Sequence, residues 1–230
     1  MTTIPGNLQH VRARIATACQ RAGRGVEEVT LLAVSKTFGA DAVRAAAAAG
    51  QRAFGENYIQ EGVEKIAALR DLGLMWHCIG PIQSNKTRLV AEHFDWVHTV
   101  DRLKIAERLS AQRPADRPPL NVCIQVNIDG GANKSGVAPG DALALARAVA
   151  ALPQLKLRGL MSIPEIAPDF EAARAVHASA RALFDQLNAD GLGLDTLSMG
   201  MSDDLEAAIA AGSTMVRIGT AIFGSRAPKP

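Results

Sequence analysis

The sequence is poor in aromatic residues and cysteine, and it carries almost no net charge. Only 4% of its 230 residues are aromatic, which counts against a surface that stacks nucleic-acid bases. A formal net charge of +2 implies no strong electrostatic attraction to nucleic acid or to a membrane surface. The three cysteines, Cys19, Cys78 and Cys123, are far apart and lack the spacing of metal ligands. We therefore expect reduced thiols, no metal site and a cytoplasmic location.

Several motifs that would define a reaction or a location are also missing. The sequence has no G-x-G-x-x-G after its first predicted strand and no G-x-x-x-x-G-K-[ST], so neither nucleotide-binding fold is indicated. It has no nucleophile elbow and no Ser-His-Asp order. No apolar run reaches membrane-spanning length, and we expect no signal peptide, because residues 1–6 are polar and an amphipathic helix follows.

What the sequence does contain is a regular alternation of short apolar runs and amphipathic segments. The runs are rich in β-branched residues, as in strands buried on both faces of a parallel sheet. They predict eight strands, at 29–34, 52–55, 74–79, 96–100, 120–126, 155–161, 196–199 and 215–218. Apolar residues at helical spacing predict helices at about 7–22, 41–49, 58–69, 84–92, 101–111, 139–152, 170–187 and 202–211.

Eight strands that alternate with helices predict an α/β fold, a single (β/α)8 TIM barrel that spans residues 1–230 as one domain. An open doubly wound sheet is the alternative, but it needs no eighth repeat. Only about a dozen residues follow the last predicted strand, too few for a full outer helix. We therefore expect the extra N-terminal helix to cover that gap.

Polar residues recur where the predicted strands end, at the rim that carries the active site in TIM barrels. The first strand runs straight into Ser35 and Lys36. A lysine at this place can be partly desolvated, which lowers its pKa and frees the amine as a nucleophile. The alternative is that Lys36 extends into solvent at a strand end.

The last two strands suggest a phosphate site. Strand 196–199 is followed by Gly200-Met-Ser202, and strand 215–218 by Gly219 and Thr220. Glycine lets the backbone approach a phosphate closely, and hydroxyl and N–H groups donate to it. Ser202 could equally be a plain helix N-cap, and Asp203 and Asp204 would repel a phosphate unless they point away. Arg217 is either functional, facing the barrel interior, or packs outward on a helix.

Several long motifs, taken together, resemble one family. They are Val-Ser-Lys-Thr at 34–37, Phe-Gly-Glu-Asn-Tyr at 54–58, His-Cys-Ile-Gly-Pro-Ile-Gln-Ser-Asn-Lys at 77–86, Gly-Leu-Met at 159–161, Leu-Ser-Met-Gly-Met-Ser-Asp-Asp at 197–204 and Val-Arg-Ile-Gly-Thr-Ala-Ile-Phe-Gly at 216–224. In this order they are similar to the pyridoxal-phosphate homeostasis proteins, the YggS/PROSC family. Phe38-Gly39, where many relatives have a second lysine or a proline, departs from the pattern.

The resemblance implies a fold type III barrel like the N-terminal domain of alanine racemase, without that enzyme's C-terminal β domain. It implies that Lys36 forms a Schiff base with pyridoxal 5′-phosphate (PLP) and that Arg217 lies beside the pyridine nitrogen. The phosphate cradle would comprise Ser202, Gly219 and Thr220, and Asn57 would line the pocket. Lys86 and Lys134 are weaker candidates for a second contact with the cofactor.

From these residues we expect a PLP-binding protein that holds, buffers or delivers the cofactor without catalysis. An arginine beside the pyridine nitrogen disfavours its protonation and makes the ring a poorer electron sink. The only tyrosine, Tyr58, cannot be assumed to replace the racemase tyrosine that comes from the second domain. We expect a monomer with PLP-dependent apoenzymes as recipients. The alternatives are a PLP-dependent amino acid racemase or lyase, and a cofactor-free phosphosugar barrel enzyme.

Overall fold

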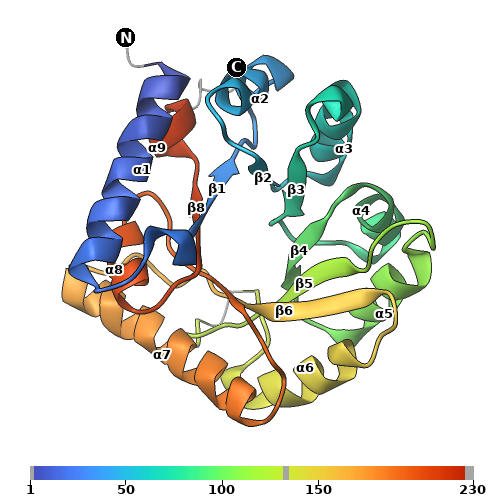
Figure 1. The fold of residues 1–230 in the computed structure, drawn as a ribbon. Coiled ribbons are helices and arrows are strands. Elements are labelled where there is room, and N and C mark those ends of the chain that lie inside the picture. Colours follow the sequence, from blue (N-terminus) through green and yellow to red (C-terminus); the bar gives the residue numbers. More distant parts are fainter. Residues whose placement is uncertain (1–2, 132–134, 226–230) are drawn as a thin grey trace.

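Eight parallel strands close into a barrel in the computed structural model, which describes residues 3–131 and 135–225. Each strand is hydrogen-bonded to the next along the chain, and the last pairs with the first. Helices surround the ring (Figure 1). The prediction of a (β/α)8 barrel is confirmed. The strands are β1 Thr30–Val34, β2 Ala53–Glu56, β3 Met75–Cys78, β4 Trp96–Val100, β5 Leu120–Gln125, β6 Leu155–Met161, β7 Thr196–Ser198 and β8 Met215–Ile218.

The helices follow the order expected from the sequence, with shifts of a few residues at their ends. They are α1 Ile4–Arg21, α2 Ala40–Ala48, α3 Ile59–Ala68, α4 Thr87–His93, α5 Leu103–Gln112, α6 Ala142–Ala150, α7 Phe170–Ala189, α8 Leu205–Ala210 and α9 Thr220–Phe223. Short 3-10 turns, η1 Val26–Glu28, η2 Arg70–Leu72, η3 Ser84–Lys86 and η4 Pro139–Asp141, link some of them. None of the described helices is long and apolar enough to cross a membrane.

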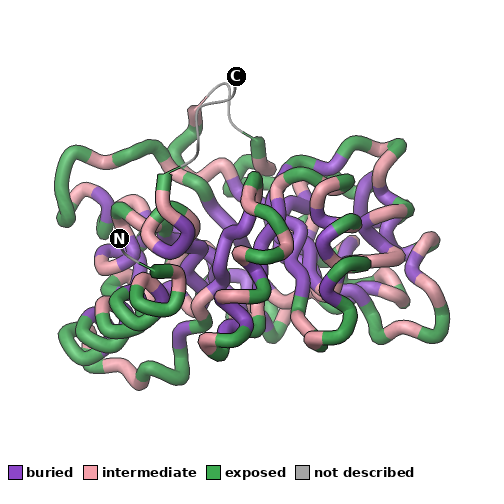
Figure 2. Tube along the Cα trace, turned by 90° about the horizontal axis from the view of Figure 1, so that it is seen from above, coloured by how far each residue is buried: buried purple, intermediate pink, exposed green. Residues whose placement is uncertain are grey.

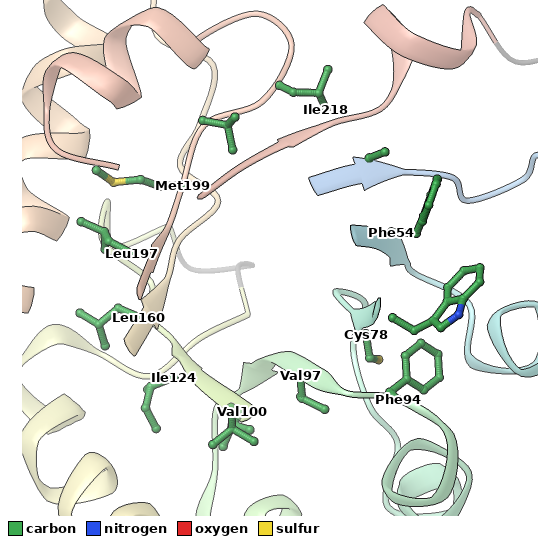
Figure 3. Packing of buried hydrophobic residues seen from close by; sticks show 14 of the residues in the cluster. Phe54, Cys78, Phe94, Val97, Val100, Ile124, Leu160, Leu197, Met199 and Ile218 are labelled. Carbon is green, nitrogen blue, oxygen red and sulfur yellow. The ribbon is translucent and has the colours of Figure 1, made fainter. Parts of the chain in front are cut away.

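The main core lies between the strands and the surrounding helices. Alternate strand residues point outward into this layer, and Figure 3 shows such side chains from successive strands, among them Phe54, Val97, Ile124 and Leu160. The tube in Figure 2 is buried along the strands and exposed on the outer helix faces. Burial of each large apolar side chain contributes about 1.5–3 kcal/mol, so this layer is the main source of stability.

The predicted role of the N-terminal helix is confirmed. Within the described residues after β8, up to 225, the chain forms only the four-residue helix α9, and α1 packs beside it and beside α8 (Figure 1). Leu8, Val11 and Ile15 of α1 are buried on this face. The Asn7 side-chain amide also donates to the carbonyl oxygen of Ile222 at 2.9 Å, which fixes α1 to α9. The outer layer is therefore completed by the start of the chain.

One helix start differs from the prediction. Ser202 does not cap α8, because the helix begins at Leu205 and Asp204 occupies the N-cap position. Residues 202–204 form a turn instead. The alternative interpretation of Ser202 as a plain N-cap is therefore wrong.

Candidate functional site

Lys36 lies on the rim formed by the carboxyl ends of the strands. It follows β1 directly after the buried Ser35 and is itself half-buried. β1 lies between β8 and β2 in the barrel. Asn57 directly follows β2, and Gly219 directly follows β8. The structure thus brings Asn57 and Gly219 to either side of the strand end that carries Lys36.

A backbone hydrogen bond joins the loop that follows β7 to strand β8. The Arg217 N–H donates to the carbonyl oxygen of Gly200 at 3.0 Å. Gly200 has a φ of +96°, and a Cβ there would come within 2.5 Å of the Ala208 Cβ, so only glycine fits this turn. Ser202, half-buried, and Thr220, exposed, are therefore carried by adjacent loops.

The carboxylate of Asp204 is hydrogen-bonded both to α7 and to a backbone N–H of its own loop. One oxygen, Oδ2, lies 2.8 Å from Nε2 of His177 on α7, and the other accepts from the Met201 N–H at 2.6 Å. Burial raises the pKa of Asp204, but the hydrogen bonds from His177 and Met201 outweigh it and hold the pKa below its usual value. The negative charge is thereby held by His177 and by the Met201 N–H, so this N–H is already paired and is not free to donate to a phosphate.

Arg217 faces the barrel interior, so the alternative of an outward arginine is wrong. It is 5% exposed, and its guanidinium donates to the Ser198 hydroxyl at 2.7 Å and to the Ser162 carbonyl oxygen at 2.9 Å. Burial lowers its pKa to about 10, while Asp204 opposes that shift. Arg217 stays protonated at neutral pH, and both of these hydrogen bonds go to neutral oxygens.

A chain of hydrogen bonds crosses the barrel interior behind Arg217. Ser198 Oγ lies 2.9 Å from Nδ1 of His98, and His98 Nε2 lies 2.9 Å from Nδ1 of His77. β4 and β7, which carry His98 and Ser198, are not neighbours in the barrel, so this bond passes through its interior. TIM barrel interiors are usually filled by branched apolar residues, and this polar chain therefore indicates a function.

The polarity of the chain follows from its charged end. Burial lowers the pKa of His77 to about 3 and that of His98 well below its usual value, so both rings are neutral at pH 7. Arg217 can only donate, so Ser198 accepts from it. We infer that the Ser198 hydroxyl donates to His98 Nδ1 and that the Nε2–H of His98 donates to His77 Nδ1. In this arrangement the accepting lone pair of each group points along the chain toward the cation.

Besides Glu56 Oε2 at the end of β2, four buried polar atoms in the described part of the chain lie near this rim or interior without a hydrogen-bond partner. They are Asn57 Oδ1, Ser162 Oγ, His77 Nε2 and Asn127 Oδ1. An unsatisfied buried polar atom costs about 1–3 kcal/mol. The buried cation, the Ser162 hydroxyl and the Nε2–H of His77 can each donate to an anionic molecule, whereas the amide oxygens of Asn57 and Asn127 can only accept hydrogen bonds. PLP, with its phosphate and phenolate oxygens, is such an anionic molecule.

A separate depression of about 300 Å³ lies between the loop after β6 and α8. Asp203, Asp204 and Glu206 line it together with apolar side chains such as Phe170. Its acidic lining would repel a phosphate, so we do not assign the candidate site to it.

Sequence reasoning placed the rim residues but missed the interior chain. His98 looked isolated in the sequence, although its partners are a histidine 21 positions away and a serine 100 positions away. Only the inward-facing register of β4, β7 and β8 brings these groups together. Lys86 lies at the end of η3, after β3, and Lys134 lies outside the described residues. No group of three or more potential metal ligands occurs in the part of the chain that the structure describes.

The fold and the site define a class of protein, a TIM barrel whose carboxyl rim combines a lysine with a buried arginine. The sequence model of the family "Alanine racemase, N-terminal domain" matches residues 6–227. The chain is 64% identical over 226 residues to the pyridoxal phosphate homeostasis protein of Pseudomonas aeruginosa, with 98% of this chain and 97% of that protein covered. The chain belongs to the pyridoxal phosphate homeostasis protein family.

Solved structures agree with this assignment. The structure of PipY from Synechococcus elongatus with PLP bound superposes with a TM-score of 0.80 at 40% identity, and the match covers 91% of this chain and 100% of PipY. Alanine racemase from Corynebacterium glutamicum shares the fold, with a TM-score of 0.64 at 21% identity, over 96% of this chain and 62% of the racemase.

Proposed function

We propose that the protein binds PLP as a Schiff base on Lys36 and holds, buffers or delivers it without turning over a substrate. PLP supplies an aldehyde that condenses reversibly with a primary amine, so a lysine can both retain it and give it up. Asn57, Arg217, Ser202, Gly219 and Thr220 would complete the site. The PLP-bound relative PipY and the name shared by the curated relatives support this function.

The observation that carries the proposal is the charge state of Arg217. The guanidinium of Arg217 is buried, and its hydrogen bonds go to Ser198 and Ser162; among the described residues no carboxylate is hydrogen-bonded to it, and Asp204 acts on it only through space. Burying such a cation is unfavourable unless an anionic or electron-rich group binds beside it. Lys36, on the rim of the same barrel, supplies the amine that such a group would need if it carries an aldehyde.

A carrier role is favoured over racemase or lyase chemistry. Arg217 remains protonated, and a cation beside the pyridine nitrogen disfavours the ring protonation that stabilises a carbanion. Tyr58, the only tyrosine, is 55% exposed at the N-cap of α3 and is poorly placed to donate a proton inside the barrel. A cofactor-free phosphosugar enzyme is disfavoured by the PLP-bound relative.

The proposal extends to the recipients of the cofactor, the oligomeric state and the location of the protein. PLP-dependent apoenzymes are the expected recipients, because a Schiff base can be exchanged to another lysine amine. We expect a monomer in the cytoplasm. The three cysteines, which are free and buried in the structure, are compatible with that compartment.

The test is an absorbance titration of the purified protein with PLP, followed by borohydride reduction and peptide mass mapping. The wild type should gain an absorbance band from the Schiff base, and reduction should attach the cofactor permanently to Lys36. Lys36→Ala should lose the covalent adduct while it keeps its fold. Lys104→Ala, which changes an exposed lysine of α5, is the control and should keep the adduct.

Two results would contradict the proposal. One is an adduct at full occupancy on another lysine in Lys36→Ala. The other is a wild-type protein that takes up no PLP. Turnover of an amino acid at an ordinary enzymatic rate, lost in Lys36→Ala, would instead decide for the racemase or lyase alternative.

A further inference from the structure

A buried polar cluster lies directly behind Lys36. Lys65 of α3 is 6% exposed, and its ammonium donates to Glu56 Oε1 at 2.8 Å and to Glu61 Oε1 at 2.6 Å. Glu56 is fully buried and also accepts a hydrogen bond from the Ser35 hydroxyl at 2.5 Å. We call Glu61 and Lys65, which lie one helical turn apart on α3, the α3 clasp.

The clasp holds the backbone on both sides of Lys36. Lys65 Nζ donates to the carbonyl oxygen of Ser35 at 2.8 Å, in the peptide unit that precedes Lys36. Glu61 Oε1 accepts from the N–H of Thr37 at 2.6 Å, in the peptide unit that follows it. Two side chains from one helix therefore anchor the only residue expected to react with PLP.

The backbone conformation of Thr37 shows that its surroundings constrain the chain directly after Lys36. Thr37 has a φ of +69°, the only positive φ among the described residues other than glycine. A β-branched residue adopts this left-handed conformation only when its surroundings impose it. The hydrogen bond to Glu61 fixes the Thr37 amide in that orientation, and so sets the direction in which Lys36 leaves the strand.

The barrel closes between β1 and β2 without the hydrogen bonds of this cluster. The ladder between β1 and β2 already continues through the bond from the Ser35 N–H to the Gly55 carbonyl at 3.0 Å. Burial raises the pKa of Glu56, while its bonds to Lys65 and Ser35 oppose the shift. A buried ion pair of this kind adds little net stability over an apolar pair, and its best-attested value is in specifying one arrangement.

We propose that Glu61 and Lys65 are positioning residues for Lys36. They hold the two peptide units around Lys36 so that its amine is directed toward bound PLP, and they thereby set how fast the amine captures the aldehyde. This inference rests on the proposed function of Lys36. It predicts that loss of the clasp slows covalent capture of PLP, while reversible binding of the phosphate and the ring keeps its affinity.

The test compares the rate of covalent capture of one ligand with the equilibrium affinity for another. Covalent capture is followed as the appearance of the PLP absorbance band, and reversible binding is measured with pyridoxine 5′-phosphate, which lacks the aldehyde. Glu61→Ala should slow capture by about tenfold, because small displacements of a reacting group have large effects on rate. Its affinity for pyridoxine 5′-phosphate should match that of the wild type.

Two matched variants make the result specific. Glu61→Gln keeps an oxygen that accepts from Thr37 and should recover part of the lost rate. Glu64→Gln, on the same helix, changes a carboxylate that accepts a hydrogen bond from Gln60, and this variant should capture PLP as the wild type does. Glu61 is about one third exposed, so its near-isosteric replacement by glutamine is compatible with folding.

The outcomes separate this inference from the proposed function. If the wild type fails to capture PLP on Lys36, the proposed function fails and the clasp proposal falls with it. If the wild type captures PLP and Glu61→Ala does so at the same rate, only the clasp proposal is overturned. Equal losses of capture and of pyridoxine 5′-phosphate affinity would also overturn it, because they would indicate general damage to the site.

Discussion

Burial of the Arg217 charge is unfavourable for folding, and the same charge is part of the proposed PLP site. Its charge is buried inside the barrel and meets the neutral oxygens of Ser198 and Ser162. Arg217→Met removes the charge and keeps a side chain of similar length. We expect the affinity for PLP to fall by about tenfold or more, because a charged hydrogen bond contributes roughly 1.5–3 kcal/mol. Equilibrium titration by absorbance measures this change.

Unfolding in urea provides the second measurement for Arg217→Met. Without ligand, the free energy of unfolding of this variant should be at most about 1 kcal/mol lower than that of the wild type. The reason is that replacing a buried charge by an apolar side chain often changes stability little. Arg158→Met is the control, since Arg158 pairs with Asp195 outside the proposed site. Wild-type PLP affinity in Arg217→Met would remove Arg217 from the site.

Gly80 lets two rim loops approach each other. A Cβ at Gly80 would lie 2.1 Å from the carbonyl oxygen of Asn57, which is backbone and cannot rotate away. Gly80→Ala should therefore displace the loop that carries Asn57, lower the free energy of unfolding by about 1–3 kcal/mol and weaken PLP binding. Urea unfolding and PLP titration check this. Gly140→Ala, where an added Cβ meets nothing within 4 Å, should change neither quantity.

Among the elements, α1 closes the outer layer in place of a full helix after β8. Leu8 is fully buried against this part of the barrel, whereas its neighbour Gln9 is exposed. Leu8→Ala should lower the free energy of unfolding by about 2–5 kcal/mol, because it leaves a cavity in a packed layer. Gln9→Ala should change it by less than about 0.5 kcal/mol. Equal effects in urea unfolding would show that α1 is not part of the cooperative core.

The α3 helix has a different relation to the barrel. Its clasp acts on the chain beside Lys36, and Glu61 is partly exposed, so loss of the Glu61 carboxylate should affect capture of PLP more than stability. This contrast between α1 and α3 separates elements that complete the fold from elements that prepare the site.

The whole molecule should lose stability in mild acid because of two buried histidines. His77 and His98 have lowered pKa values, about 3 for His77, because burial disfavours their charged forms. The unfolded chain binds protons on them near pH 6.5, while the folded protein does not. Their contribution is therefore fully present above pH 6.5 and is lost as the pH falls toward the folded pKa values.

Each buried histidine should add a slope of about 1.4 kcal/mol per pH unit well below pH 6.5, or about 2.7 kcal/mol for the pair. Urea unfolding at several values between pH 7.5 and pH 5 measures this slope. His77→Gln should reduce it by about half, whatever its effect on stability at pH 7.5. A slope unchanged by His77→Gln would show that His77 does not remain neutral in the folded protein.

Much of the fold was predictable because its signals are local. The apolar run that ends at Lys36 and the helical stripes depend on residues close in sequence, and the eight strands emerged from them. The start of α8 was not predictable, because Ser202 and Asp204 are both good caps. Asp204 occupies that position in the structure, and its carboxylate is hydrogen-bonded to His177 of α7 and to the Met201 N–H.

The order of strands and helices, the rim position of Lys36 and the motifs of the family can all be derived from the amino-acid sequence. They follow from periodicity and from residues next to one another in the chain. The contact of His98 with Ser198 across the barrel, and that of Lys65 with Ser35 behind the rim, depend on the folded arrangement instead. Such contacts depend on strand register and barrel closure, which fix which side chains face inward and which strand ends become neighbours.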